Sequence, residues 1–246
     1  AKKLGYAESN PSSDLNGDDV ASKLKILTAL SFNSFIDNKN ISIEGIKSVD
    51  HTDINNANNL GYKIKLLGIS EFLEKKVIQR VHPCLVKNTS YIANIDGVLN
   101  AVIVEGNPAG QTVIQGEGAG PEATTSALIS DLSSVMRGNT KFPFVLADKE
   151  RKKINFENIL NIKISAYLRL DVIDKHGVLS NITDVMAKNR VSIKRLIQNP
   201  YKSKKFSSII IITHKTLDRN LNKALKELNN KRYILKKPKL IRIENI

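Results

Sequence analysis

Acidic residues and one lysine gather near the start of this 246-residue chain, at Glu8, Asp14, Asp18, Asp19 and Lys23. Asp19 and Lys23 are four positions apart, so on a helix they share a face and form an ion pair. A lysine held protonated by acids donates a proton to a forming alkoxide, and carboxylates bind a substrate ammonium group. The alternative is a surface ion pair without chemistry, worth roughly a few tenths of a kcal/mol.

A helix is needed to hold this pair on one face. Apolar residues recur at three- and four-residue steps from Val20 to Leu30 and predict a helix over 18–32, with acids at its N-terminal end. Strand-like runs separated by turn formers follow and predict a sheet-dominated α+β domain. The expected strands cover 41–49, 62–69, 77–86, 98–104 and 111–114, and a short helix covers 52–59.

The second half of the chain has a different and more regular pattern. A glycine-rich stretch at 116–121 leads into a helix over 121–137, and basic, turn-forming residues at 138–161 are typical of a linker. The order βαββαβ then predicts a ferredoxin-like sandwich. Its elements are expected at 164–173, 178–188, 191–198, 207–213, 217–228 and 239–244. The sequence thus predicts an N-terminal domain over 1–137, a linker over 138–161 and a C-terminal domain over 162–246.

Composition narrows the class of protein. A hydrophobic share of 41% with 25% charged residues excludes wholesale disorder and collagen-like repeats. The formal net charge of +14 permits a nucleic-acid or anionic-membrane partner. Because lysines mix with Asn and Ile and form no stripe interleaved with aromatics, we expect neither partner, although salt-dependent nucleic-acid binding remains a third hypothesis.

The cysteine count and the hydropathy pattern bear on location. Cys84 is the single cysteine, which excludes an internal disulfide and a cysteine-rich metal site and indicates a reducing compartment. The sequence has no apolar run near the about 20 residues of a membrane span and no secretory signal at its start. We therefore expect a cytoplasmic protein with no metal site, in which His82 is structural.

The N-terminal residues resemble the homoserine dehydrogenase family. Its signature appears as Gly5-Tyr6-Ala7-Glu8, Pro11, Asp14-Leu15-Asn16-Gly17, Asp19 and Lys23. The resemblance continues in register to about residue 136, through Val81-His82-Pro83 and Gly118-Ala119-Gly120. Residues 164–246 resemble an ACT domain, an amino-acid-sensing module, whose first turn reads Asp174-Lys175-His176-Gly177-Val178-Leu179.

The resemblance implies a reaction and a role for each matching residue. The reaction is the NAD(P)H-dependent reduction of L-aspartate 4-semialdehyde to L-homoserine, a step in threonine, methionine and isoleucine biosynthesis. Lys23 would be the general acid or base, assisted by Asp19. The acids Glu8, Asp19 and Asp14 would surround the substrate's α-amino group.

The resemblance also implies cofactor, effector and subunit contacts. Gly5, Gly118 and Gly120 would approach NAD or NADP. The family's N-terminal dinucleotide-binding domain is missing from the sequence, so we expect the chain alone to be inactive and the helix at 121–137 to return to that domain. A homodimer or homotetramer is expected, with exposed edges of the ACT sheet as candidate subunit contacts.

An amino acid such as threonine is the implied effector, at Asp174, Gly177 and Val178.

Three residues depart from the usual patterns: Ala123 stands in place of Pro, Thr125 in place of Ala, and His176 in place of the ACT Pro. A non-catalytic, amino-acid-binding regulator is the alternative function.

Overall fold

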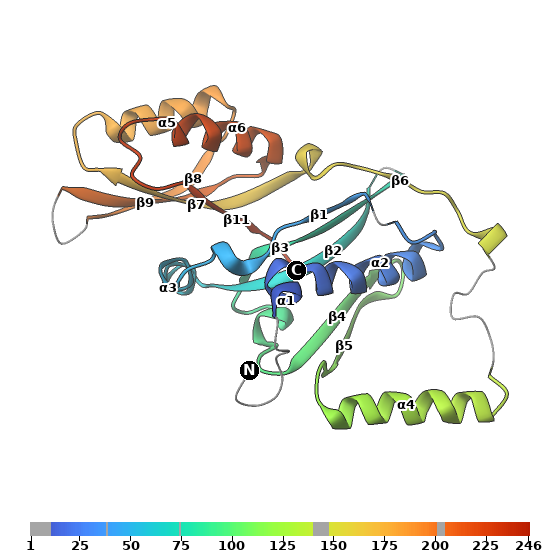
Figure 1. The fold of residues 1–246 in the computed structure, drawn as a ribbon. Helices are drawn as coiled ribbons and strands as arrows, with labels where there is room; N and C mark the ends of the chain where they lie inside the picture. Colours follow the sequence, from blue (N-terminus) through green and yellow to red (C-terminus); the bar gives the residue numbers. More distant parts are fainter. Residues whose placement is uncertain (1–10, 38, 74, 140–147, 201–204) are drawn as a thin grey trace.

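The computed structural model describes residues 11–37, 39–73, 75–139, 148–200 and 205–246. In the N-terminal half the elements are α1 Ser12–Asn16, α2 Asp18–Phe32, β1 Ile41–Ile43, α3 His51–Asn59, β2 Tyr62–Leu73, β3 Lys76–Lys87, β4 Leu99–Gly106, β5 Gly110–Glu117 and α4 Pro121–Met136. In the C-terminal half they are β6 Asn155–Phe156, β7 Lys163–Ile173, α5 Val178–Lys188, β8 Ile193–Pro200, β9 Phe206–Thr213, β10 Thr216–Leu217, α6 Asp218–Asn229 and β11 Lys239–Ile243. Figure 1 shows their arrangement.

Helix α2 begins and ends where the apolar spacing predicts. Its buried face, with Ala21 and Leu24, packs against Val81 of β3. The short helix α1 precedes it and was not predicted. Gly17 separates the two helices in a left-handed conformation, with φ of 87°, and its N–H donates to the carbonyl oxygens of Ser13 and Asp14. A glycine adopts that conformation without strain.

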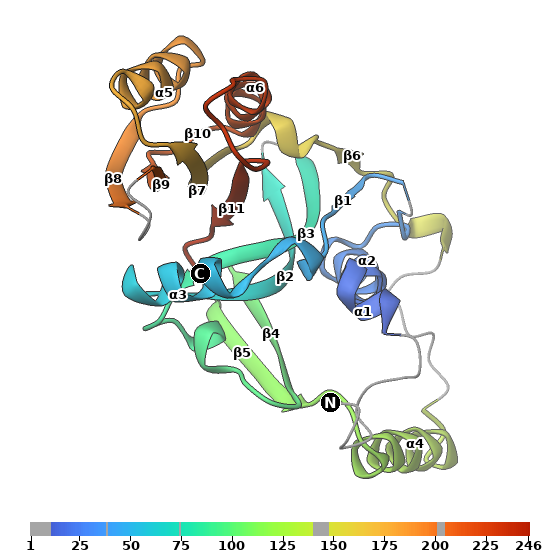
Figure 2. The same ribbon diagram turned by 60° about the vertical axis from the view of Figure 1, so that its left-hand side comes forward.

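Strand β3 is the centre of the N-terminal sheet. Strand β2 pairs with it in antiparallel register along its whole length, from Tyr62↔Lys87 to Leu73↔Lys76. The other edge of β3 pairs in parallel register with three strands, which follow one another along it in the order β6, β1 and β11. Helices α2 and α3 pack against this sheet (Figure 2). Part of the predicted linker therefore belongs to the sheet, through β6.

The strand predicted over 41–49 ends at Ile43 in the structure, so the prediction is wrong beyond that residue. The chain leaves the sheet at Glu44, and a 3₁₀ turn covers Ile46–Ser48. A side chain at Gly45 would meet the backbone of α1, with its Cβ 2.7 Å from Cα of Asn16. The local pattern resembles a strand, but close packing of this loop against α1 determines its path.

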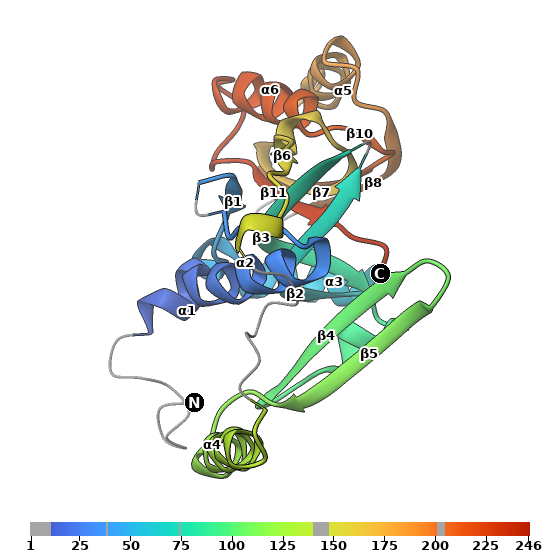
Figure 3. The same cartoon turned by 90° about the vertical axis from the view of Figure 1, so that its right-hand side faces the viewer.

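Strands β4 and β5 form a separate two-stranded hairpin that leads into α4. Figure 3 shows the hairpin and α4 projecting away from the main sheet. Helix α4 exposes a row of large apolar side chains, Leu128, Ile129 and Leu132, at 58–63% of their surface. An apolar helix face of this kind marks a surface for contact with another domain or subunit.

The C-terminal half is the predicted ferredoxin-like sandwich. The four long strands lie in the order β11-β7-β9-β8, each antiparallel to its neighbour. Helices α5 and α6 cover one face (Figures 1 and 2). Their fully buried side chains include Ile182, Met186, Leu221 and Leu228. Leu179, in the first turn of α5, is 38% exposed by contrast.

The two halves share one nine-stranded sheet. Strand β11 lies between β7 and β3, and Arg242 and Ile243 register with Cys84 and Leu85. A cluster containing Leu85, Tyr167 and Ile243 fills the junction. The β11 edge of the ACT sheet is thus covered within the chain, and β8 at the other end of that sheet is the edge to which the expected pairing between subunits would apply.

None of the described helices is long and apolar enough to cross a membrane.

Candidate active site at the start of helix α2

The predicted acid–lysine pair forms on helix α2. The Nζ atom of Lys23 lies 2.7 Å from Oδ2 of Asp19, and both side chains are about half exposed, at 57% and 41%. Asp14 lies in α1, on the other side of the Gly17 turn, and is exposed. Glu8 and Gly5 lie outside the described residues. The structure therefore places Asp14, Asp19 and Lys23 on an open surface formed by α1 and the first turns of α2.

The loop that follows β1 packs against the turn between α1 and α2. Glu44 donates its backbone N–H to the carbonyl oxygen of Val81 at 2.7 Å, which fixes the loop to β3. Gly45 then lies against the backbone of Leu15 and Asn16 without room for a Cβ. The position of Asp14 and Asp19 thus depends on a backbone-to-backbone contact.

The predicted cofactor glycines flank the end of β5 and the start of α4. Gly120 is the N-cap residue of α4, with φ of 124°, and no side chain caps this end of the helix. The amide groups at such an uncapped N-terminus attract negative charge. At Gly118 an added Cβ would overlap the side chain of Asn100. Gly118 therefore lies where a side chain approaches the backbone closely, and Gly120 has a backbone conformation that favours glycine.

Two stretches of the chain match known protein families. Residues 1–133 match the family model for homoserine dehydrogenase. Residues 166–232 match the model for the ACT domain. This chain belongs to the homoserine dehydrogenase family. Ala123 and Thr125 lie within a regular α4, so these departures from the family pattern leave the helix intact.

Individual relatives agree with the family match. The homoserine dehydrogenases of Helicobacter pylori and Neisseria gonorrhoeae are 38% and 34% identical over the whole chain. A crystal structure of a homoserine dehydrogenase from Thiobacillus denitrificans covers the whole chain with a TM-score of 0.90 and 36% identity. The chain spans 58% of the length of the two curated relatives and 57% of that crystallised chain.

Buried arginines join the family's catalytic half to the ACT domain. Arg169 on β7 donates to Asp53 at 2.7 Å and to Asp50 at 2.6 Å, both at the start of α3. Arg242 on β11 donates to Asp218 at 2.7 Å and to Glu44 at 2.8 Å. Both arginines are buried, and a buried charge is stable only when it is paired.

A third arginine, Arg80 on β3, makes a similar junction with the end of the chain. It is 2% exposed and donates to Glu244 and to Glu71 at 3.1 and 3.0 Å. Burial would raise the pKa of the Glu244 carboxyl, but the interaction with His82 and the charge of Arg80 lower that pKa below its ordinary value. Glu244 is therefore held as a carboxylate.

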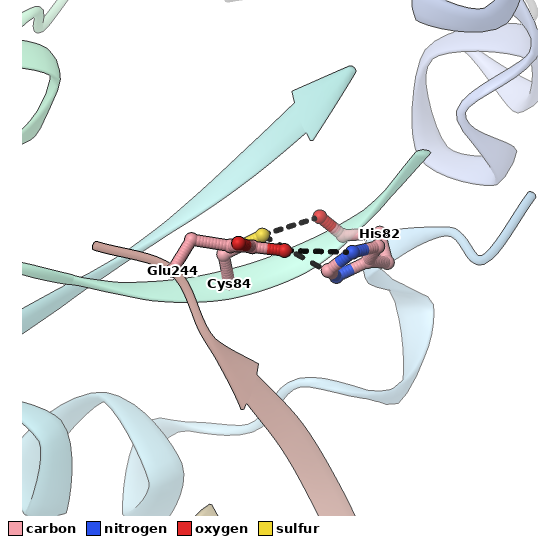
Figure 4. Close-up of side chains that lie close together, drawn as sticks. All are labelled: His82, Cys84 and Glu244. Carbon is pink, nitrogen blue, oxygen red and sulfur yellow. Dashed lines mark hydrogen bonds and ion pairs between the residues drawn. The ribbon is translucent and has the colours of Figure 1, made fainter. Parts of the chain in front are cut away.

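His82, Cys84 and Glu244 form a buried cluster that the sequence did not predict (Figure 4). Their donor atoms lie within 4.8 Å of one another, and these residue types ligate transition metals. His82, however, turns Nδ1 toward Sγ of Cys84 at 3.3 Å and Nε2 toward Glu244 at 3.5 Å. Burial also raises the pKa of the Cys84 thiol well above its ordinary value. Within the cluster His82 and Cys84 thus contact each other at hydrogen-bonding distance, as expected of a structural histidine.

The predicted effector residues converge on one cavity of about 600 Å³. Asp174, Gly177 and Val178 line it, together with His176 and Gln198. Gly177 has φ of 80° and is the N-cap residue of α5. The side-chain amide of Gln198 donates to the Asp174 carboxylate at 3.4 Å. His176, which stands in place of the usual proline, thus lines this cavity beside the turn.

Sequence reasoning missed the junction residues because their partners are far apart along the chain. Arg242 and Glu44 are 198 positions apart, and Arg80 and Glu244 are 164 apart. One signal was available: an arginine inside an apolar strand run, such as Arg169 between Leu168 and Leu170, implies a buried acidic partner.

Proposed function

We propose that this chain is the substrate-binding and regulatory part of a homoserine dehydrogenase that interconverts L-aspartate 4-semialdehyde and L-homoserine. The observation that carries the proposal is the ion pair between Lys23 and Asp19, which lies inside the region that matches the family. A regulator without catalysis would need only the ACT domain, so the match over residues 1–133 favours the enzyme.

Lys23 is the proton donor in this proposal. When hydride reaches the carbonyl carbon of the semialdehyde, negative charge develops on its oxygen, and the ammonium group of Lys23 donates a proton there. In the reverse direction the neutral amine accepts that proton from the homoserine hydroxyl. Asp19 lies 2.7 Å away and orients the Lys23 amine through the ion pair.

The acidic side chains select the amino-acid substrate. An exposed carboxylate at Asp14, close in sequence to Asp19 and across the Gly17 turn, presents negative charge to a substrate ammonium group. We assign Glu8 to the same pocket from its position in the family signature. Binding by charge at one end leaves the aldehyde end free to meet Lys23.

A nicotinamide cofactor, NAD or NADP, supplies or accepts the hydride when bound. The chain's own contribution fits such a group: Gly120 and the uncapped N-terminus of α4 offer backbone N–H groups to a polar cofactor. Gly118 keeps the backbone beside them free of a Cβ, and Gly5 is assigned from the family signature alone. Most cofactor contacts are assigned to the dinucleotide-binding domain of the longer relatives.

Helix α4 is proposed to pack on that dinucleotide-binding domain. The support is its exposed apolar row, together with relatives that are longer than this chain. We place the enzyme in the cytoplasm as a homodimer or homotetramer. Cys84 supports the reducing location, since it is a free thiol. Without that domain, we expect residues 1–246 alone to have no activity.

The ACT domain is proposed to bind an amino-acid effector such as threonine. The cavity beside the β7–α5 turn supports this, because its volume of about 600 Å³ and the Asp174 carboxylate suit a small molecule with an ammonium group.

The test is an absorbance assay of NAD(P)H formation during homoserine oxidation. It is run on residues 1–246 and on the same residues joined to an upstream dinucleotide-binding domain of the family. We expect activity in the joined protein alone. No activity in either protein, with both folded by circular dichroism, would contradict the enzyme and favour the amino-acid-binding regulator.

A further inference from the structure

We propose that Glu44 and Arg242 are positioning residues, through which the ACT domain holds the turn that carries the catalytic side chains. The inference rests on the proposed function, because it concerns the placement of Asp19 and Lys23. It also makes a purely structural claim about that turn, which is measurable without any activity.

The first step is the anchor of Arg242 inside the ACT domain. Its Nε and Nη2 atoms both donate to Asp218, at 2.7 and 3.4 Å. Asp218 is fully buried at the first turn of α6 and accepts a further hydrogen bond from Asn222 at 2.7 Å. With its guanidinium fixed on one side by α6, Arg242 has little freedom to move.

The second step leads from the ACT domain into the catalytic half. The remaining Nη1 atom of Arg242 donates to Oε2 of Glu44 at 2.8 Å. The Arg242 side chain is 9% exposed and the Glu44 side chain 41% exposed. A charge-assisted hydrogen bond that is partly shielded from water is stronger than an exposed one. The bond therefore ties the loop after β1 to β11.

The third step joins that loop to the catalytic turn. Gly45, next to Glu44, lies against the backbone of Leu15 and Asn16, immediately before Gly17. Gly17 in turn packs on the side chains of Val81 and Ile43. Because backbone contacts this close allow almost no adjustment, a shift of Glu44 displaces the start of α2. Asp19 and Lys23 lie in the first two turns of that helix.

A second link between the halves provides a matched comparison. Arg169 of the ACT domain bonds Asp50, whose side chain is 51% exposed, at 2.6 Å. Asp50 caps α3, and the contacts that place the α1–α2 turn come from the Glu44 loop instead. Both acids are half exposed and both face a buried ACT arginine, so they differ mainly in the element they hold.

The experiment compares Glu44→Gln with Asp50→Asn by amide hydrogen exchange in residues 1–246. Each change removes one charge and keeps the side-chain shape. We expect exchange over 12–24 to rise about threefold in Glu44→Gln and more in Glu44→Ala, while Asp50→Asn leaves that segment unchanged. Equal exchange over 12–24 in wild type and both Glu44 variants, or an equal rise in Asp50→Asn, would overturn the proposal.

A kinetic arm separates this proposal from the proposed function. In the protein joined to a dinucleotide-binding domain, Glu44→Gln is expected to lower kcat for homoserine oxidation about tenfold, with Asp50→Asn near wild type. If the wild type has no activity but the exchange result holds, the positioning role stands and the proposed function fails. If exchange over 12–24 rises and kcat does not fall, the bond between Glu44 and Arg242 stabilises the turn but does not affect the rate of the reaction. The catalytic part of the proposal is then wrong.

Discussion

At the scale of single residues, the molecule depends on charges buried between its two halves. Arg80, Arg169 and Arg242 lie on strands and are buried, and each bonds a carboxylate from another segment. Removing one partner of such a pair costs about 3–5 kcal/mol, because it leaves the other charge buried and alone. These residues make the junction specific as well as stable.

Glu244 makes this junction sensitive to acid. Its folded pKa lies below its ordinary value because Arg80 and His82 outweigh the effect of burial. A carboxyl with a lowered folded pKa stabilises the fold above its unfolded pKa, and that contribution is lost as pH falls through the folded pKa. We expect the free energy of unfolding to fall below about pH 5, and to fall less steeply in Glu244→Gln.

Urea unfolding followed by circular dichroism at a series of pH values measures this dependence. Glu105→Gln, a change at an exposed carboxyl on β4, is the control and should keep the wild-type slope. The same acid dependence in Glu244→Gln and wild type would show that Glu244 does not carry the effect.

At the scale of elements, periodicity predicted most of the structure. Helix α2 and the βαββαβ order are confirmed, because each depends on local apolar spacing. The strand expected over 41–49 failed since Gly45 meets α1, a contact that no local pattern encodes. The predicted pair of Asp19 and Lys23 is confirmed for the same local reason, four-residue spacing on one helix.

The contact at Gly45 gives a prediction for the α1–α2 element. Gly45→Ala adds a Cβ that meets the backbone of Leu15 and Asn16, so the turn must move. We expect a loss of about 1–3 kcal/mol in the free energy of unfolding, measured by urea denaturation. Gly116→Ala is the control, because no atom lies within 4 Å of its added Cβ. Equal stability of the two variants would contradict the close packing described here.

At the scale of the whole molecule, the catalytic half and the ACT domain form one unit. Strand β11 continues the sheet from β7 to β3, and the junction core combines Leu85, Tyr167 and Ile243 from three strands. The sequence predicted two domains with a linker and could not show this union. Two domains that look separable by composition share strand pairing between β3 and β11, whose paired residues are far apart along the chain.

One cooperative unfolding transition follows from the shared sheet. Because β11 pairs with both β7 and β3 and contributes Ile241 and Ile243 to the junction cluster, differential scanning calorimetry of residues 1–246 should give a single peak. Its van't Hoff and calorimetric enthalpies should agree. Two resolved peaks, or one half that stays folded by hydrogen exchange while the other melts, would show that the halves are independent.

The central claim is that Lys23 transfers the proton in homoserine oxidation. The most direct measurement compares kcat of Lys23→Ala and Lys25→Ala in the protein joined to a dinucleotide-binding domain. Lys25 lies on the same helix but is not the partner of Asp19. We predict that Lys23→Ala lowers kcat about 10²–10⁴-fold and that Lys25→Ala stays near wild type. Wild-type turnover in Lys23→Ala, with the fold intact, would contradict the account.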